Sequence, residues 1–342
     1  MNAPVLLHRY ARPSSIEAAL QLLAADTQAA PLAGGTELVP LTRARLRSAS
    51  TLVDLGRLPL AGVRREGDRL VLGALTTAQE AAGHPLVQAH APLVAQALRA
   101  GASAQVRQRA TLAGNLLQAP RCPWFRSGAP GCNRRAPGSG CDAQAAAQAG
   151  AAEAERWLAP FGGQAQCAAA APSDLAVALQ ALRAQVLLRS LHGTRRLPLE
   201  ALWCDGDQRP GVPGAPALAP GELITALEVL VPPGATALSQ FDKVRERASF
   251  EFALVSVAVQ LQLDAQQRIA DAAVSAGGVA PTPWRLQAVE AALRGQRWPT
   301  LQPAAIAAHT FDATATPAAR GPKPRLLARS LERALITLRR TA

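Results

Sequence analysis

Ala29-Ala-Pro-Leu-Ala33 is followed directly by Gly34-Gly35-Thr36, and this junction sets the fold of the N-terminal part of the chain. The apolar residues predict a short strand, and the paired glycines predict a tight turn. Glu37 to Leu46 then has a helical pattern, and Leu52-Val-Asp-Leu55 predicts a second strand. Strand, helix and strand in this order predict a βαβ unit, which implies two parallel strands.

Helix and strand patterns continue on both sides of this unit. Ser14-Ser-Ile-Glu17 predicts a capping box, in which Ser14 and Glu17 satisfy free amides at the start of a helix over about 15–25. Arg69-Leu-Val-Leu-Gly73 predicts another strand. Thr77-Ala-Gln-Glu80 predicts a second capping box, before a helical region from Leu86 to Arg99. The pattern up to this point is α/β.

Residues 119–172 interrupt this pattern with a Pro/Gly/Arg-rich stretch and then an Ala/Gln-rich run. A loop of this length inside a domain is usually functional or disordered. After Pro172 a helix returns, followed by strands near 185–189 and 223–230, and Pro232-Pro-Gly234 predicts a linker.

The last segment has the pattern of an α+β domain. Val257, Val259, Leu261 and Leu263 alternate with alanine or glutamine, which predicts a half-buried antiparallel strand. A turn at Asp264 leads into a partner strand over 269–274. Helical patterns over about 284–294 and 325–340 complete the segment.

The composition indicates a soluble, globular chain of two or three domains. Its 342 residues exceed the roughly 250–300 at which single cores stop growing. The net charge of +12 suggests nucleic acid, but all except two of the 36 basic residues are arginines spread along the chain and only 4% of residues are aromatic, so we expect no nucleic-acid partner. The longest apolar-leaning stretch, Phe252 to Leu263, is too short for a membrane span, and the first nine residues lack the pattern of an export signal.

Two glycine-containing turns could approach a phosphate. Consecutive glycines at Gly34 and Gly35 let backbone amides come close to an anion, but a plain tight turn explains them as well. The turn Ala110-Thr-Leu-Ala-Gly-Asn115 offers a hydroxyl, an amide and a carboxamide, and it too is compatible with an ordinary strand-end turn.

Four of the five cysteines lie close together in the sequence: Cys122, Cys132, Cys141 and Cys167. Their spacing is wider than the C-x2-4-C of structural zinc sites and is compatible with an iron–sulfur cluster, while free or disulfide-bonded thiols remain a third reading. Neighbouring arginines at positions 121, 126, 134 and 135 are expected to depress the thiol pKa values and to offset cluster charge. Cys204 is expected to be a bystander.

Other catalytic constellations are absent from the sequence. It contains no G-x-S-x-G or H-E-x-x-H motif, and its five histidines are dispersed. Lys243 stands out because arginine fills nearly every other basic position, although a surface charge would explain it equally.

Five motifs follow one another along nearly the whole chain: Leu32–Leu38, Ala110–Gln118 leading into Arg121–Arg126, Cys132–Cys141, Pro172–Leu179 and Lys243–Ala253. Taken together, they resemble the FAD-binding medium subunit of the xanthine oxidase family of molybdenum hydroxylases. They most resemble the branch that carries an extra [4Fe-4S] cluster, as in periplasmic aldehyde oxidoreductases and 4-hydroxybenzoyl-CoA reductases.

This resemblance implies an α/β and α+β fold. Residues 1–55 and 56–232 would form two FAD-binding subdomains of the type shared with vanillyl-alcohol oxidase, and the second would carry a cysteine-rich insertion over about 119–171. Residues 233–342 would form an α+β domain like the C-terminal domain of carbon monoxide dehydrogenase flavoproteins.

Carried over position by position, the resemblance also implies the site residues. Ala33, Gly34, Gly35, Thr36, Glu37 and Leu38 would form the pyrophosphate loop, with Thr111, Gly114 and Asn115 as a second contact. Asp174 would bind on the ribityl or flavin side, and Lys243 would lie near the flavin. Cys122, Cys132, Cys141 and Cys167 would ligate a [4Fe-4S] cluster, and no substrate-oxidising residue is expected in this chain.

The family resemblance implies an electron-transfer flavoprotein subunit. A large subunit would hold the molybdenum cofactor, a small one the [2Fe-2S] clusters, and a small molecule or protein would accept electrons from FAD. The alternatives are a noncatalytic zinc-binding scaffold and a standalone FAD oxidase. The chain would be cytoplasmic, or periplasmic if exported with a partner bearing a twin-arginine leader. Ala171 departs from the histidine usual in this branch.

Overall fold

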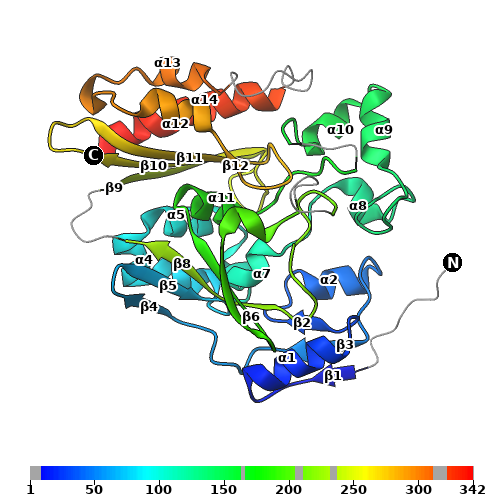
Figure 1. Cartoon of the computed structure of the whole chain (residues 1–342). Helices are drawn as coiled ribbons and strands as arrows, with labels where there is room; N and C mark the ends of the chain where they lie inside the picture. The colour runs from blue at the N-terminus through cyan, green and yellow to red at the C-terminus, as the bar shows by residue number, and fades with distance from the viewer. Residues whose placement is uncertain (1–8, 163–165, 205–210, 232–236, 311–321, 342) are drawn as a thin grey trace.

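The computed structural model describes residues 9–162, 166–204, 211–231, 237–310 and 322–341. These residues form three β-sheets with helices packed around them (Figure 1). In this part of the chain no helix combines the length and the apolar character needed to cross a membrane. The linker predicted at 232–234 lies outside the described residues.

The first sheet confirms the predicted βαβ unit. Its strands are all parallel, in the order β1-β3-β2, and two helices connect them. Ser15, rather than Ser14, caps the first helix by accepting a hydrogen bond from the amide of Ala18. Alanine has no carboxylate to complete a capping box, so the box predicted at Ser14 and Glu17 was wrong. The elements are β1 (Arg9–Ala11), α1 (Ile16–Ala25), β2 (Ala30–Leu32), α2 (Leu38–Arg43) and β3 (Thr51–Asp54).

The second sheet is antiparallel, in the order β4-β5-β8-β6-β7. The predicted strand β5 therefore does not extend the parallel sheet, because its partner β8 arrives much later in the chain. The strands are β4 (Val63–Glu66), β5 (Arg69–Gly73), β6 (Gln185–Ser190), β7 (Gly193–Pro198) and β8 (Leu223–Leu230), with a 3-10 turn at Leu199–Leu202.

Helices pack on this sheet and enclose the largest apolar core. The predicted capping box at Thr77 and Glu80 is present, whereas the helix predicted over 86–99 is divided in two at Ala91, since Pro92 begins a new helix. The helices are α3 (Ala78–Gly83), α4 (Pro85–His90), α5 (Pro92–Ala100), α6 (Ala104–Arg107), α7 (Leu112–Leu116) and α11 (Asp174–Ala181).

The cysteine-rich insertion contains three short helices, which lie together above α2 at one side of the molecule (Figure 1). They are α8 (Pro123–Ser127), α9 (Asp142–Gln148) and α10 (Ala152–Trp157).

The third sheet, in the order β12-β11-β10-β9, is also antiparallel, as predicted for its two central strands. Its strands are β9 (Ala237–Val244), β10 (Val255–Leu263), β11 (Ile269–Gly277) and β12 (Trp284–Arg285). One face packs against α12 (Gln287–Leu293), α13 (Pro303–Ala308) and α14 (Pro322–Thr341), next to a 3-10 turn at Trp298–Thr300.

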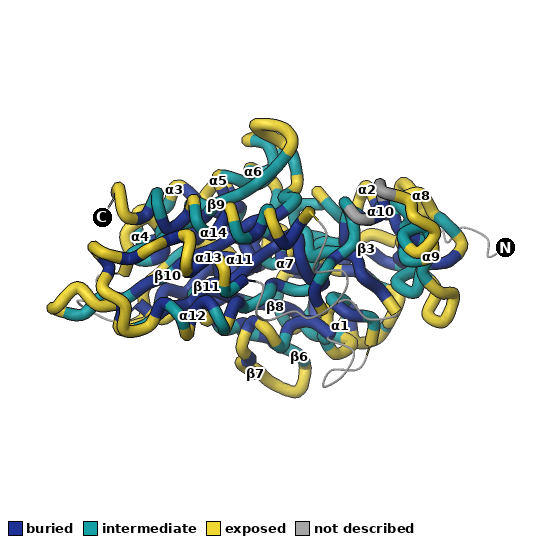
Figure 2. Tube along the Cα trace, turned by 90° about the horizontal axis from the view of Figure 1, so that it is seen from above, coloured by how far each residue is buried: buried dark blue, intermediate teal, exposed yellow. Residues whose placement is uncertain are grey.

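The expectation of a half-buried β10 was wrong. Ala258, on the strand face opposite the valines, is fully buried because it packs in one cluster with residues of α5 and α11. Figure 2 shows that α11 and the adjoining strands are largely buried, whereas most of β7 and the turn before it are exposed. The third sheet is therefore covered on both faces.

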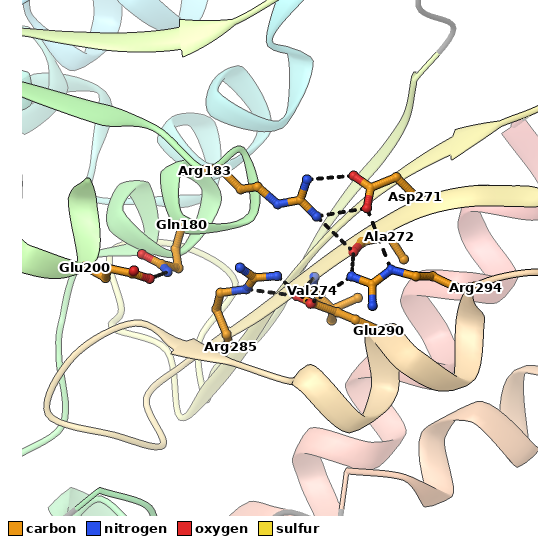
Figure 3. A network of polar contacts seen from close by, with 9 residues as sticks. All are labelled: Gln180, Arg183, Glu200, Asp271, Ala272, Val274, Arg285, Glu290 and Arg294. Atoms are coloured by element: carbon orange, nitrogen blue, oxygen red, sulfur yellow. Dashed lines mark hydrogen bonds and ion pairs between the residues drawn. The ribbon is translucent and has the colours of Figure 1, made fainter. Parts of the chain in front are cut away.

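Charged groups fasten α11 to the third sheet (Figure 3). Arg183, just after α11, donates two hydrogen bonds to Asp271 of β11, at 2.7 and 2.9 Å. Burial alone would raise the pKa of Asp271, but the bonds and charge of Arg183 outweigh it and lower that pKa. Beside this pair, buried Glu290 accepts a hydrogen bond from the amide of Val274 and forms an ion pair with Arg285. The Arg183 bonds therefore tie the end of α11 to the sheet that carries Lys243, and the Glu290 contacts tie α12 to the same sheet.

Candidate functional site

Two cavities, each of about 360 Å³, meet at the turn after β2. We call the one beside β2 and β8 the loop cavity, and the one between α5, α11 and β9 the domain cavity. Thr36, Glu37 and Gly114 line both. Residues from all three sheets therefore line the two cavities. Each cavity has the size of a small-molecule site.

All eleven residues predicted to bind the cofactor line these cavities, although they are spread over 33–243 in the sequence. The loop cavity is lined by Ala33, Gly34, Gly35, Thr36, Glu37, Leu38, Thr111 and Gly114. The domain cavity is lined by Thr36, Glu37, Gly114, Asn115, Asp174 and Lys243.

The two glycines of the first turn meet different demands. A Cβ atom on Gly34 would lie 1.7 Å from the carbonyl oxygen of Arg109, so the turn packs directly on the backbone of the second loop. Gly35 has a φ of 73°, a left-handed conformation that side chains disfavour. Gly34 is thus required by contact between the two loops, whatever the ligand.

Glu37 joins the turn to the cysteine-rich insertion. Its carboxylate accepts a hydrogen bond from the amide of Ala119 at 3.1 Å and pairs with Arg121 and Arg126 at 2.9 and 2.5 Å. The sequence analysis expected these two arginines to lower the pKa values of the cysteine thiols. In the structure both arginines instead form ion pairs with Glu37.

Hydrogen bonds also hold the second loop. The hydroxyl of Thr111 accepts from the amide of Gly114 and so caps α7. The carboxamide oxygen of Asn115 accepts from the hydroxyl of Ser173, which in turn caps α11. The second loop is thereby tied to the helix that begins at Asp174.

Lys243 and Asp174 form a buried ion pair in the domain cavity. The Lys243 ammonium lies 2.7 Å from the Asp174 carboxylate, and the two side chains are 5% and 11% exposed. The ammonium also donates to the carbonyl of Ala100 at 3.2 Å. Asp174 stands in the first turn of α11, where a negative charge is favourable. The surface role considered for Lys243 is excluded by this burial.

Replacing Lys243 with methionine is expected to lower the free energy of unfolding of the cofactor-free chain by about 3 kcal/mol, because Asp174 would keep a buried charge without its partner. Urea unfolding measures this. The double variant Lys243→Met/Asp174→Asn is expected to recover much of the loss. Equal midpoints for Lys243→Met and the wild type would show that the pair does not contribute to stability.

Sequence reasoning did not assign several other residues that line the domain cavity, among them Arg107, Phe250 and Phe252. The guanidinium of Arg121 lies 4.4 Å from the ring centre of Phe252, an aromatic that is partly exposed. Both phenylalanines lie inside the motif that begins at Lys243, and this motif is the sequence signal that could have identified them as cavity residues.

The four predicted metal ligands gather in one apolar cluster. Cys122 and Cys167 are buried, Cys132 and Cys141 are partly buried, and Phe125 packs among them. None of the four forms a disulfide. Residues 132 and 141 also face each other in an antiparallel bridge.

Hydrogen bonds to sulfur are present in this cluster. The Cys167 sulfur accepts from the guanidinium of Arg134 at 3.4 Å and from the amide of Ala169 at 3.5 Å. Burial raises the pKa of Cys122 and of Cys141, although backbone amides act in the opposite direction. For these two thiols the expected depression of the pKa was therefore wrong. Within the described ranges, no three His, Cys, Asp or Glu side chains form a group placed to hold a metal ion.

Known families match both parts of the chain. Residues 6–232 match the FAD-binding domain in molybdopterin dehydrogenases, and residues 240–331 match the C-terminal domain of carbon monoxide dehydrogenase flavoproteins.

Individual relatives agree with these matches. The chain is 40% identical over 264 residues to the aldehyde oxidoreductase FAD-binding subunit PaoB of Escherichia coli K12, which covers 77% of this chain and 78% of that protein. It is 27% identical to the nicotine 6-hydroxylase medium subunit of Paenarthrobacter nicotinovorans, over 86% of this chain and 82% of the relative.

Solved structures share the fold. Carbon monoxide dehydrogenase from Hydrogenophaga pseudoflava superposes with a TM-score of 0.71 at 23% identity, covering 97% of this chain and 96% of that one. Quinoline 2-oxidoreductase from Pseudomonas putida 86 gives a TM-score of 0.71 at 20% identity, with 98% of both chains covered. These likenesses confirm the predicted fold class. Because the first family match spans residues 6–232 and the 40% identity extends over 77% of the chain, the protein belongs to the FAD-binding medium subunits of the xanthine oxidase family of molybdenum hydroxylases.

Proposed function

We propose that this chain binds FAD across the loop and domain cavities and passes electrons from molybdenum and [2Fe-2S] partner subunits to an external acceptor. The observation that carries the proposal is that the two cavities share Thr36, Glu37 and Gly114, with the buried Lys243–Asp174 pair in the domain cavity. The elongated double cavity suits a dinucleotide with one polar centre and two flat ends.

The residues present fit this cofactor. The turn over 34–36 and the loop at Thr111–Asn115 would hold the pyrophosphate, since their small residues admit close approach of a ligand. Asp174 and Lys243 would orient the ribityl or flavin end. Bound FAD supplies a group that accepts electrons singly and releases them in pairs. The protein's own part is to bind the cofactor, to exclude water from the domain cavity and to leave one edge open to the acceptor.

We further propose that Cys122, Cys132, Cys141 and Cys167 ligate a [4Fe-4S] cluster. Thiolates are the ligands that such clusters require, and the hydrogen bonds to the Cys167 sulfur are of the kind that tune them. The shared apolar cluster supports the proposal, although among the described residues no three His, Cys, Asp or Glu side chains are placed to hold a metal ion together.

The same proposal divides the chain into functional segments. Residues 1–55 and 56–232 would be the FAD-binding subdomains, 119–171 the insertion with the cluster, and 233–342 the C-terminal domain. The chain would work in a complex with a large molybdenum subunit and a small [2Fe-2S] subunit. Its compartment, cytoplasm or periplasm, would follow from the leader of a partner, which fractionation of cells expressing the three subunits together would reveal.

One experiment separates this function from its rivals. The chain is purified without oxygen, alone and after coexpression with the two partner subunits, and its flavin, iron, sulfide and zinc are measured. FAD in the isolated chain, with turnover only in the complex, is the expected result. Turnover by the isolated chain would favour a standalone FAD oxidase. A colourless chain loaded with zinc would favour a noncatalytic scaffold.

A further inference from the structure

A small cavity of about 40 Å³ lies between the insertion and the start of α14, next to the domain cavity. We call it the Lys323 cavity. Three buried nitrogen donors of residues that line it have no hydrogen-bond partner: Nε of Arg121, Nε of Arg156 and Nε1 of Trp157. A buried donor left unpaired costs about 1–3 kcal/mol, so three of them at one cavity require a common explanation.

Lys323 adds a charge to the same cavity. Its side chain is buried and donates to the carbonyls of Leu158 and Gly278, at 3.0 and 2.8 Å. Both acceptors are neutral, and among the described residues no carboxylate forms an ion pair with Lys323. Burial first, and then the charge of Arg156, lower its pKa to about 8. Within the described residues the ammonium is therefore held by neutral carbonyls, with no carboxylate as its counterion.

Three carboxylates that the structure describes near this cavity pair with arginines. Glu37 pairs with Arg121, and Glu246 pairs with Arg156 at the surface. Glu251, which also lines the Lys323 cavity, pairs with Arg247 at 3.0 Å. Among the side chains that the structure describes, no carboxylate is therefore paired with the Lys323 ammonium or bonded to the three unpaired nitrogens.

We propose that the Lys323 cavity binds one small inorganic anion of halide size. The anion would accept hydrogen bonds from the unpaired nitrogens of Arg121, Arg156 and Trp157 and would compensate the charge of Lys323. The volume supports this size: it exceeds the roughly 10–15 Å³ that a cavity needs to hold one water and is far too small for a nucleotide. The anion would tie α10 and α14 to the segment that leads into Cys122.

Bromide is the probe for this site, because it can be located by its anomalous scattering. Crystals of the purified holoprotein are soaked in sodium bromide, and one bromide is expected in the Lys323 cavity with FAD and any cluster in place. Ordered water there without an anomalous peak would overturn the proposal, because water alone would then satisfy the donors.

Variants test the donors in solution. The thermal midpoint of the holoprotein is measured against sodium chloride, with sodium gluconate keeping the ionic strength constant. Trp157→Phe keeps most of the ring volume but removes one donor, and it is expected to weaken chloride binding about tenfold or more. Trp298→Phe, in the C-terminal core, is the matched control and should bind chloride as the wild type does. Lys323→Met is expected to abolish the chloride effect. If Lys323→Met does not fold, Trp157→Phe still decides, because equal chloride dependence in Trp157→Phe and wild type would contradict the site.

Discussion

Replacing Gly34 with alanine is expected to abolish FAD binding and to lower the free energy of unfolding by about 3 kcal/mol or more. The new Cβ would lie 1.7 Å from the carbonyl oxygen of Arg109, which is backbone and cannot rotate away as a side chain could. The two loops would have to separate, and overpacking of this kind costs about 1–3 kcal/mol even where the contact is milder. The FAD content of the reconstituted chain and its urea unfolding measure the two effects.

Gly83→Ala is the matched control for this variant. A Cβ on Gly83 meets no heavy atom within 4 Å, and the residue ends α3 with an ordinary φ, so alanine should leave stability and FAD content unchanged. If Gly34→Ala retained FAD and unfolded at the wild-type urea concentration, the close approach of the two loops would be wrong.

Replacing Cys132 with serine is expected to remove all cluster iron and sulfide from the chain while leaving its FAD content unchanged. A serine hydroxyl is a poor substitute for a thiolate ligand, and the half-buried Cys132 lines neither the loop cavity nor the domain cavity. Chemical iron and sulfide analysis of protein purified without oxygen, together with the flavin absorbance, gives both readouts.

Cys204→Ser serves as the control for this prediction, since Cys204 is buried outside the cysteine cluster and should not affect iron content. The two variants are expected to have opposite effects. The folded fraction of Gly34→Ala should lose FAD and keep iron, whereas Cys132→Ser should lose iron and keep FAD. Unchanged iron in Cys132→Ser would show that Cys132 is not a ligand.

Local patterns located the elements whose residues carry their own signal. The strands β2 and β3 and the helix between them follow from apolar runs and paired glycines, and the capping box at Thr77 follows from its side-chain spacing. The strands β7 and β9 were missed because much of each is polar or exposed, and only hydrogen bonding to β6 and β10 makes them strands. Pairing with the neighbouring strand leaves no periodic trace in a polar or exposed segment.

The burial of β10 shows the same limit. Alternating valines and small residues indicate one apolar face, and the sequence cannot tell that Ala258 meets α5 and α11 instead of water. Glu37 and Arg126 are a further case, because nothing local relates a turn in the first sheet to an arginine of the insertion.

By itself the sequence determined the parallel unit around Gly34, the grouping of four cysteines in one irregular segment, and, through five motifs, the family and its eleven cavity residues. Only the tertiary structure decided what those residues do. Gly34 packs on the carbonyl of Arg109, Glu37 is bound by two arginines, and Lys243 is buried against Asp174. The reason is physical: strand and turn propensities act over a few neighbouring residues, whereas close backbone approach and the burial of charge arise when segments far apart in the chain are packed together.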